Sequence, residues 1–505
     1  MEIKDKKPNI IAIIGAIILL VLAVIGLSYA FFSAIIIGGE TDTTIEGEGA
    51  KLSLVYTDGK SVITSSNIMP GWSATKTFTV TNNGEGTAYY KLNISNITNE
   101  FVTGGLTFSI TSNDGGATIA ETPVGTENRT ISDTITIEVS KTHTYTVTAK
   151  YINLDTDQIP DLGKSFSYTI GIEASKEPTL SETILANNEV KTPITTPGTE
   201  VSTANEALLA SAEDDYGTSY YFRGAVTNNY VEFANKCWRI VRIGGDNTVK
   251  LILHNDNTSN VSNPCSSANN STTAAFAHYN GSTYTSAFNS SYNDNAYVGF
   301  MYGTPSSSTY EATHANTNKS TILTNLETWY NNNLKTYESV IDDNVFCNDK
   351  TNVTDTAYDP WSKNPNGLGY AKNATYYSAT QRILSSVGSA GGTGPSLKCN
   401  GELSKITSKI GLITADELVY AGYAATTSGS TSYLQENATG DYWWSLSPLY
   451  FSGVYASAWS VDGFSGLLID YGVYGAIGFR SYISLKSSVK VSSGTGTSED
   501  PYVVK

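Results

Sequence analysis

The sequence predicts a multidomain protein with an N-terminal transmembrane helix, an all-β sandwich and a C-terminal α+β domain. Three observations lead to this architecture. An uncharged apolar run follows three lysines near the N-terminus. Residues 40–175 then alternate between apolar and polar side chains, as half-buried strands do. Residues 213–505 combine similar alternating runs with segments of helical periodicity.

Residues 1–38 are expected to form a cytoplasmic tip and a membrane-spanning or signal segment. No charged residue occurs between Ile10 and Ile37, and this run exceeds the roughly 20 residues that span a bilayer. The lysines before it hold the N-terminus in the cytoplasm and place the following domains outside. Small residues at Ser28–Ala30 also fit a signal-peptide cleavage site. We favour a retained single-pass anchor in the cell membrane because the run continues to Ile37; the alternative is secretion after cleavage near Ala30.

The overall charge is low and acidic. The chain carries a formal net charge of −16, and only 15% of its residues are charged. Nucleic-acid binding calls for basic patches, so we expect no nucleic-acid partner. A basic membrane-surface role is excluded for the same reason. The expected partners are an unidentified protein or glycan and the membrane itself, through the N-terminal helix.

The four cysteines are disulfide candidates. Cys237, Cys265, Cys347 and Cys399 form no C-x-x-C pair, which argues against a zinc knuckle or a thioredoxin motif. Outside the cell they can form two disulfides, with three possible connectivities. Among these we prefer a connectivity that pairs Cys347 with Cys399.

Residues 40–175 are predicted to form an Ig-like β-sandwich. Thr77–Thr81 and Thr144–Thr148 alternate in period two, and turn signals punctuate the region at sandwich-like spacing. Asp155, Asp157 and Asp161 carry the oxygen ligands that Ca²⁺ prefers. Spacing alone is a weak signal, so we expect no metal there.

The start of this region resembles a known family. Leu52–Leu54, Asn67–Gly71 and Lys76–Gly84 are similar to TasA/camelysin proteins, which are exported β-sandwich proteins of Gram-positive bacteria. Some members form biofilm fibres. The small-residue site at Ser28–Ala30 followed by Phe31 and Phe32 also looks like their signal region. The resemblance implies a surface protein whose first domain is a stalk or a fibre-forming unit.

Residues 176–212 are predicted to link the two outer domains. The stretch is rich in Thr, Pro, Glu and Ser and has no strong periodicity. Pro193 and Pro197 stiffen such a chain. We expect a partly extended tether that ends in a short helix near Ala204–Ala212.

Residues 213–505 are predicted to form antiparallel strands with a few helices packed on them. Helices are expected at Ser320–Tyr337 and Gln381–Ser386, and a third begins with a capping box in which Thr414 is the N-cap. The expected strands are 219–226, 237–243, 248–253, 443–447, 454–461, 467–473, 479–485 and 501–504.

Short motifs in this region resemble the formylglycine-generating-enzyme-like domains, which have a C-type-lectin-like fold. Ile410–Ala421 looks like their Thr-x-x-Glu helix, and Trp443–Pro448 and Gly478–Arg480 are similar to their closing strands. Tyr220–Gly224 and Cys237–Arg242 resemble the openings of surface proteins of Gram-positive gut bacteria that end in such domains. The motifs imply a C-type-lectin-like domain over residues 213–505.

The chain departs from that family in two places. The family's Gly-x-Arg-Pro ending has Ser481 after Arg480 here. Catalytic members keep reactive cysteines in the terminal region, whereas this chain has none after Cys399. Thiolate chemistry is therefore not carried over.

The window 449–482 has an unusual composition. It contains no Asn, Thr, Lys, Glu, Gln, Met or Pro, although the chain at large is rich in Asn and Thr. Apart from Trp459, every residue type in it is reachable from an Asn codon by replacing the adenines. This pattern resembles the variable region of proteins diversified by a retroelement, which carry it near the end of a C-type-lectin-like domain. The alternative is an ordinary Gly/Tyr-rich strand pair with a hairpin at Asp462–Gly463.

The window is expected to divide between core and surface. Ala458, Trp459 and Val461 are predicted to be core. Large aromatic side chains and small polar ones suit adaptable binding. The predicted contact residues are Tyr450, Phe451, Tyr455, Asp462, Phe464, Asp470, Tyr471 and Tyr474.

No catalytic motif is found in the sequence. The histidines have no metal-ligand spacing, and His254, His278 and His314 are expected to be solvated. No nucleophile elbow, phosphate loop or dinucleotide fingerprint occurs, so we expect no cofactor and no enzyme activity. The predicted function is ligand binding at the cell surface. The alternatives are a structural, fibre-forming protein and an enzyme on the formylglycine-generating scaffold.

Overall fold

The computed structural model describes residues 43–47, 52–58, 68–363 and 374–504. The chain divides into two units between Glu177 and Pro178, and each is described separately. The transmembrane or signal segment predicted for residues 1–38 lies outside the described residues. Within the part that is described, no helix is both long and apolar enough to span a bilayer.

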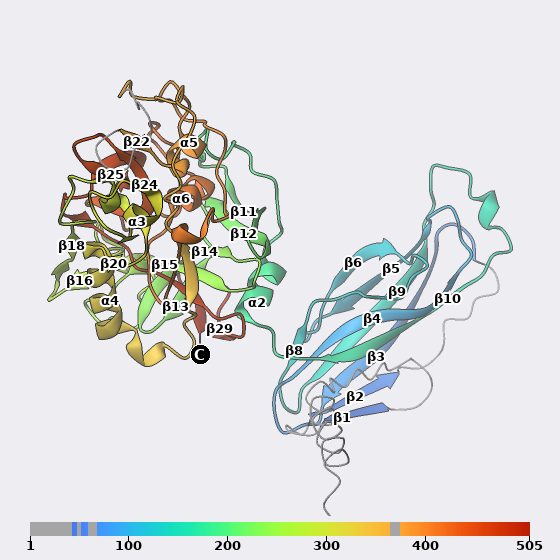
Figure 1. The fold of residues 1–505 in the computed structure, drawn as a ribbon. Helices are drawn as coiled ribbons and strands as arrows, with labels where there is room; N and C mark the ends of the chain where they lie inside the picture. Colours follow the sequence, from blue (N-terminus) through green and yellow to red (C-terminus); the bar gives the residue numbers. More distant parts are fainter. Residues whose placement is uncertain (1–42, 48–51, 59–67, 364–373, 505) are drawn as a thin grey trace, which may run out of the picture. The chain divides into compact units, whose positions relative to one another are not determined.

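The first unit is built from two antiparallel sheets (Figure 1). The larger sheet, in spatial order, contains β1 (Thr43–Gly47), β2 (Leu52–Asp58), β3 (Trp72–Asn82), β9 (Thr142–Tyr151), β5 (Leu106–Ser112) and β6 (Ile119–Pro123). The smaller sheet contains β10 (Phe166–Ser175), β4 (Ala88–Asn99), β7 (Arg129–Thr130) and β8 (Ile135–Ile137). The predicted β character of this region is confirmed.

The core of the first unit lies between these sheets. Phe78 and Tyr145 from the larger sheet and Tyr90 and Ile172 from the smaller one belong to a single buried cluster. The alternating residues of β9 are buried and half-buried or exposed in turn, as the period-two pattern predicts.

The three aspartates weighed as Ca²⁺ ligands have different surroundings. Asp155 and Asp157 are exposed, whereas Asp161 is buried. Asp161 accepts hydrogen bonds from the backbone N–H of Val102 at 2.6 Å and from the Tyr151 hydroxyl at 3.0 Å. The Asp161 carboxylate therefore links the loop that contains Val102 to β9.

The segment predicted as a partly extended tether belongs to the second unit from Pro178 onward. It contains α2 (Leu180–Asn187), and the helix predicted near Ala204–Ala212 is wrong because β11 (Ala207–Asp214) occupies that stretch. An ion pair of 3.0 Å joins Glu206 to Arg223, and both side chains are fully buried. Pairing with a neighbouring strand outweighs the helix propensity of the Ala- and Leu-rich stretch.

The main sheet of the second unit has eight strands. Its spatial order begins with β11, β12 (Gly217–Gly224), β14 (Lys236–Ile243), β13 (Tyr230–Phe233), β30 (Tyr502–Val504) and β29 (Val491–Ser493). In addition, β15 (Val249–Asn255) pairs with β14, and β28 (Tyr482–Leu485) pairs with β15. The strands predicted from the alternating runs lie here and in the second sheet.

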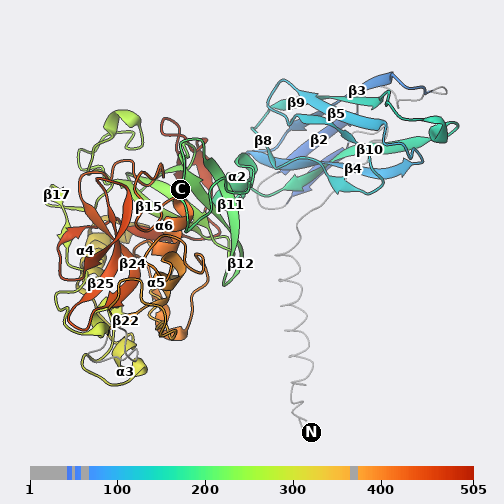
Figure 2. The ribbon, with the colours of Figure 1, turned by 90° about the horizontal axis from the view of Figure 1, so that it is seen from above.

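The second sheet carries most of the window 449–482. Its order is β18 (Thr285–Ser286), β27 (Ile477–Gly478), β24 (Tyr442–Phe451), β25 (Ala456–Asp462) and β26 (Leu467–Gly472), and β22 (Thr375–Tyr376) pairs with β24. Figure 2 shows β22, β24 and β25 together in the second unit. Three two-stranded ladders complete it: β16 (His278–Tyr279) with β17 (Ser282–Thr283), β19 (Met301–Tyr302) with β20 (Asn318–Lys319), and β21 (Asn344–Cys347) with β23 (Lys405–Ser408).

The α-helices in the described part of the second unit are short: besides α2, they are α3 (Tyr310–His314), α4 (Thr321–Asn333), α5 (Ser378–Ile383) and α6 (Ala415–Ala421). Ser320 caps α4 by accepting from the Leu323 N–H, close to the predicted start. The capping box predicted at Thr414 is confirmed, with Glu417 as its partner. The helix predicted at Gln381–Ser386 begins and ends earlier than expected, as α5.

Both disulfides are formed. Cys347 pairs with Cys399, as preferred from the sequence, and Cys237 pairs with Cys265. Two disulfides suggest an oxidising environment outside the cytoplasm.

Candidate functional site

The window 449–482 lies on the edge of the second sheet. It covers the end of β24, all of β25, β26 and β27, and the first residue of β28. Strand β26 is the last in the sheet order. The hairpin predicted at Asp462–Gly463 joins β25 to β26, with Asp462 opposite Leu467. The window therefore presents a hairpin and an edge strand.

Several of the predicted contact residues are at the surface. Phe464 is 64% exposed and Tyr474 is 55% exposed. Asp470 is also exposed, and Tyr455 and Tyr471 are half-buried. We call these five residues together the hairpin face; Asp470 and Tyr471 are successive residues of β26 and project from opposite sides of the sheet.

Two of the predicted contact residues are buried, and this corrects the sequence prediction. Tyr450 and Phe451 are 4% and 1% exposed, so their side chains are part of the core. The Tyr450 hydroxyl lies 3.0 Å from the Tyr455 hydroxyl, and its ring packs on Trp361 at 5.1 Å between centroids. Tyr450 thus positions Tyr455 from beneath. Burial raises the pKa of Tyr450, so it stays a neutral phenol.

Asp462, another predicted contact residue, is half-buried and shapes the turn. Its carboxylate accepts from the Phe464 backbone N–H at 2.9 Å and from the Ser465 hydroxyl at 2.6 Å. This is the local side-chain-to-backbone bonding that fixes tight turns. Asp462 therefore holds Phe464 outward.

Neighbouring aromatic side chains extend the hairpin face. Tyr442 packs against Phe464 at 5.6 Å and against Tyr471 at 5.7 Å. Tyr292, which is 44% exposed, packs against Tyr474 at 4.9 Å. Sequence reasoning missed both tyrosines because they lie outside the window. Tyr442 is the first residue of β24, directly before the predicted strand 443–447, which is a usable signal, whereas Tyr292 lies in a polar loop without a pattern.

A large exposed apolar side chain inside the window was also missed. Val454 is 69% exposed in the β24–β25 turn. The Ser452 hydroxyl accepts from the backbone N–H groups of Val454 and Tyr455 at 3.2 and 3.0 Å. Val454 has an aliphatic side chain, so nothing in the sequence favours it as a contact residue over the tyrosines beside it.

The inner side of the window is packed as predicted. Ala458, Trp459 and Val461 are buried. The Ser445 hydroxyl donates to the Trp459 carbonyl at 2.8 Å and adds a link between β24 and β25. The exposed side chains of the window therefore project from strands whose inner residues are packed in the core.

Arg480 fastens the end of the window to the core. Its guanidinium donates to the Leu253 carbonyl at 3.1 and 2.9 Å and to the Leu434 carbonyl at 2.6 Å. It also lies over the Trp443 ring at 4.9 Å. The Gly-x-Arg motif is therefore structural here.

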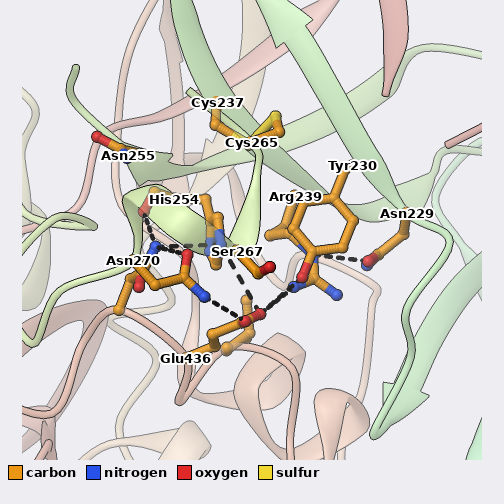
Figure 3. A network of polar contacts seen from close by, with 12 residues as sticks. Asn229, Tyr230, Cys237, Arg239, His254, Asn255, Cys265, Ser267, Asn270 and Glu436 are labelled. Atoms are coloured by element: carbon orange, nitrogen blue, oxygen red, sulfur yellow. Dashed lines mark hydrogen bonds and ion pairs between the residues drawn. A yellow bond between two sulfur atoms is a disulfide. The ribbon is translucent and has the colours of Figure 1, made fainter. Parts of the chain in front are cut away.

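A partly buried polar network lies next to this region (Figure 3). Glu436 accepts from Arg239 at 2.8 Å, from the Tyr230 hydroxyl at 2.7 Å and from Asn270 at 2.8 Å. Asn229 accepts from Arg239 Nε at 2.7 Å. These contacts tie β13 and β14 to the loop before β24.

The prediction of solvated histidines is wrong at two positions. His254, which is drawn within this network, and His314 are both fully buried. Burial, Arg239 and Arg480 hold the pKa of His254 well below its usual value, so its imidazole is neutral. Burial and Lys350 lower the pKa of His314 to about 3. Both positions read as strand ends or polar loops, and only the tertiary packing buries them.

The described residues contain no group of three His, Cys, Asp or Glu side chains arranged to hold a metal. All four cysteines of the chain are in disulfides. No protein-family model matches the chain, and a search of curated proteins finds no match.

Proposed function

We propose that this protein is an extracellular recognition protein that binds a protein or glycan ligand through the hairpin face. The observation that carries the proposal is the exposure of Phe464 in the β25–β26 turn and of Tyr474 in the β26–β27 connection, while the inner side of the window is packed. Each of these rings packs against a neighbouring tyrosine, and contiguous exposed apolar surface, unlike isolated exposed side chains, marks interaction sites. Tyr, Trp and Phe are also enriched in binding surfaces.

The geometry of the face supports rigid recognition. Asp462 fixes the turn that carries Phe464, and Tyr442 packs against that ring. Tyr292 supports Tyr474 in the same way. Because these side chains are already placed, binding loses little conformational entropy.

The remaining parts of the proposal concern the chain around this face. We assign residues 213–505 to the C-type-lectin-like fold and 40–175 to a TasA-like, Ig-like spacer that carries the face away from the membrane. The uncharged run before residue 38 is the proposed membrane anchor. Retroelement diversification of 449–482 is part of the same proposal and is supported by the composition of the window.

Binding is tested with the purified full chain on a glycan array and on a protein array. Phe464→Ala and Tyr474→Ala are each expected to weaken binding by about 2 kcal/mol, or roughly thirtyfold. Tyr216→Ala is the matched control, since Tyr216 is 58% exposed and lies outside the window. Equal binding by all three variants, or loss with Tyr216→Ala alone, contradicts the proposed face.

The two alternative functions predict other outcomes. A fibre-forming protein gives filaments in electron micrographs of the concentrated protein. Its assembly should be unaffected by Phe464→Ala. A formylglycine-generating type of enzyme needs a reactive thiol, and at least one of the two disulfides must open before this chain has one.

A further inference from the structure

A buried lysine and a buried asparagine meet between β15 and β21. Lys250 is 4% exposed and Asn344 is 6% exposed. Lys250 Nζ donates to Asn344 Oδ1 at 2.9 Å. The amide carbon Cγ lies one C=O bond, about 1.2 Å, from that oxygen. An amine and an amide carbon are therefore held side by side in the interior.

The surroundings of Lys250 lower its pKa and so make the neutral amine more accessible than on an exposed lysine. Its Nζ lies 5.5 Å from the Phe346 ring centroid and 5.9 Å from that of Tyr482. Among the described residues, Asn344 supplies the one acceptor within hydrogen-bond distance of this three-proton donor. Burial and the neighbouring Arg242 lower the pKa of Lys250 to about 8. At pH 7 roughly one molecule in ten then carries the nucleophilic free amine.

The other side of the amide faces a carboxylate. Asn344 Nδ2 donates to Asp342 Oδ2 at 3.4 Å and to the Thr248 hydroxyl at 3.2 Å. These bonds fix the amide so that its oxygen faces the lysine and its nitrogen faces Asp342. A carboxylate in contact with a leaving nitrogen can carry a proton to it.

We propose that Lys250 and Asn344 join in an intramolecular isopeptide bond. Lys250 Nζ attacks Asn344 Cγ, the Nζ–Cγ bond forms, and the Cγ–Nδ2 bond breaks. One proton of the amine passes through Asp342 to Nδ2, which leaves as ammonia. Asn344 Oδ1 remains as the carbonyl of the new amide. The reaction exchanges one amide for another and needs no oxidant, reductant or cofactor.

The leaving group has a place to go. A cavity of about 50 Å³ is lined by Lys250, Asn344, Phe346 and Tyr482, and by the Cys347–Cys399 disulfide. A polar cavity of this size holds water and can take up ammonia. The new bond joins β15 to the first residue of β21, the strand that also contains Cys347.

A second lysine–asparagine contact in the same unit serves as an internal comparison. Lys350 is fully buried, and its Nζ lies 2.6 Å from Asn316 Oδ1. Burial lowers the pKa of Lys350 to about 7. However, Lys350 also donates to two backbone carbonyls, and Asn316 Nδ2 faces the Lys405 carbonyl, which cannot carry a proton. We therefore expect no bond at Lys350.

The test is mass spectrometry of peptides from the full chain after reduction, alkylation and proteolysis. We expect one branched peptide containing both Lys250 and Asn344, lighter than its two linear parts by one ammonia. Lys250→Met and Asn344→Ala should each abolish it. Asp342→Asn should slow its formation about a hundredfold while both disulfides still form, which separates a role in the reaction from a folding defect. Lys350 and Asn316 should appear only in linear peptides.

Linear peptides with unmodified Lys250 and Asn344 from the wild-type chain overturn the proposal. A branched peptide at Lys350 and Asn316 instead overturns it as well. Formation at an unchanged rate in Asp342→Asn overturns the assigned role of that carboxylate. None of these outcomes depends on whether the hairpin face binds a ligand.

Discussion

The two units of this chain reach stability by different means. The first unit is made of regular strands of up to 12 residues around one core, and it contains no cysteine. The second has long irregular connections, both disulfides and three fully buried arginines, Arg223, Arg239 and Arg480. Regular ladders satisfy backbone groups by themselves, whereas irregular segments need side chains to do so.

The buried arginines show how the second unit meets that need. Arg480 donates to two carbonyls, and Arg223 donates to the Val419 carbonyl at 2.9 Å. In the described part of the first unit, no lysine or arginine is buried. The second unit therefore depends on a few side chains whose loss is costly, and the first on many small contributions.

The largest expected difference in stability between the two units comes from the disulfides. Loop closure over 28 and 52 residues corresponds to about 4 kcal/mol per bridge in the chain-entropy view. Reduction should therefore unfold or strongly destabilise the second unit and leave the first unchanged. Tryptophan fluorescence during denaturant unfolding reports this, because only Trp72 of the seven tryptophans precedes residue 178. An unchanged denaturant midpoint of the second unit after full reduction of the disulfides would contradict this difference between the two units.

The next largest effect is expected at Arg242. Its guanidinium contacts Glu417 and Asp214 at 2.8 and 2.9 Å, and all three side chains are largely buried. Arg242→Met should cost about 3–5 kcal/mol because it leaves two buried carboxylates without their partner. Lys150→Met in the first unit breaks the half-exposed pair with Glu121 and should cost under about 1 kcal/mol. Similar losses of stability in Arg242→Met and Lys150→Met would contradict the stated difference between the two units.

Acid should destabilise the second unit through its buried histidines. The pKa of His314 is about 3 in the folded protein, against about 6.5 in an unfolded chain. Between these values the unfolded chain binds the extra proton, so stability is full above pH 6.5 and falls as the pH drops toward 3. The slope is about 1.4 kcal/mol per pH unit for this group.

His254, whose pKa is also lowered, adds a slope of the same sign. His314→Phe should flatten the pH dependence of the denaturant midpoint. A variant that keeps the full slope would show that His314 does not contribute.

The smallest effect is expected on the hairpin face. Phe464→Ala and Tyr474→Ala remove exposed side chains and should change stability by under about 0.5 kcal/mol. Trp459→Ala, from the inner side of the same window, should cost about 3–5 kcal/mol. Equal losses at Phe464 and Trp459, measured by chemical denaturation, would mean that the outer residues serve the fold.

Local signals predicted local structure well. The Thr414 capping box, the Ser320 start of α4 and the alternation in β9 depend on neighbouring residues, and the structure contains all three. The predicted core positions of Ala458, Trp459 and Val461 are also found in the structure.

Long-range packing explains what the sequence did not predict. The helix expected near Ala204–Ala212 is a strand because β12 pairs with it. Tyr450 is buried under Trp361, which lies 89 positions earlier in the chain. Tyr292 joins the hairpin face from a distant polar loop. None of these positions carries a signal in its own neighbourhood.

Sequencing this locus in several strains tests the central claim most directly. The account predicts that substitutions concentrate in residues 449–482 at outward positions such as Val454, Phe464 and Tyr474, while Trp459 and Val461 stay constant. Substitutions spread evenly along the chain, or concentrated at the buried positions of the window, would contradict a diversified recognition face.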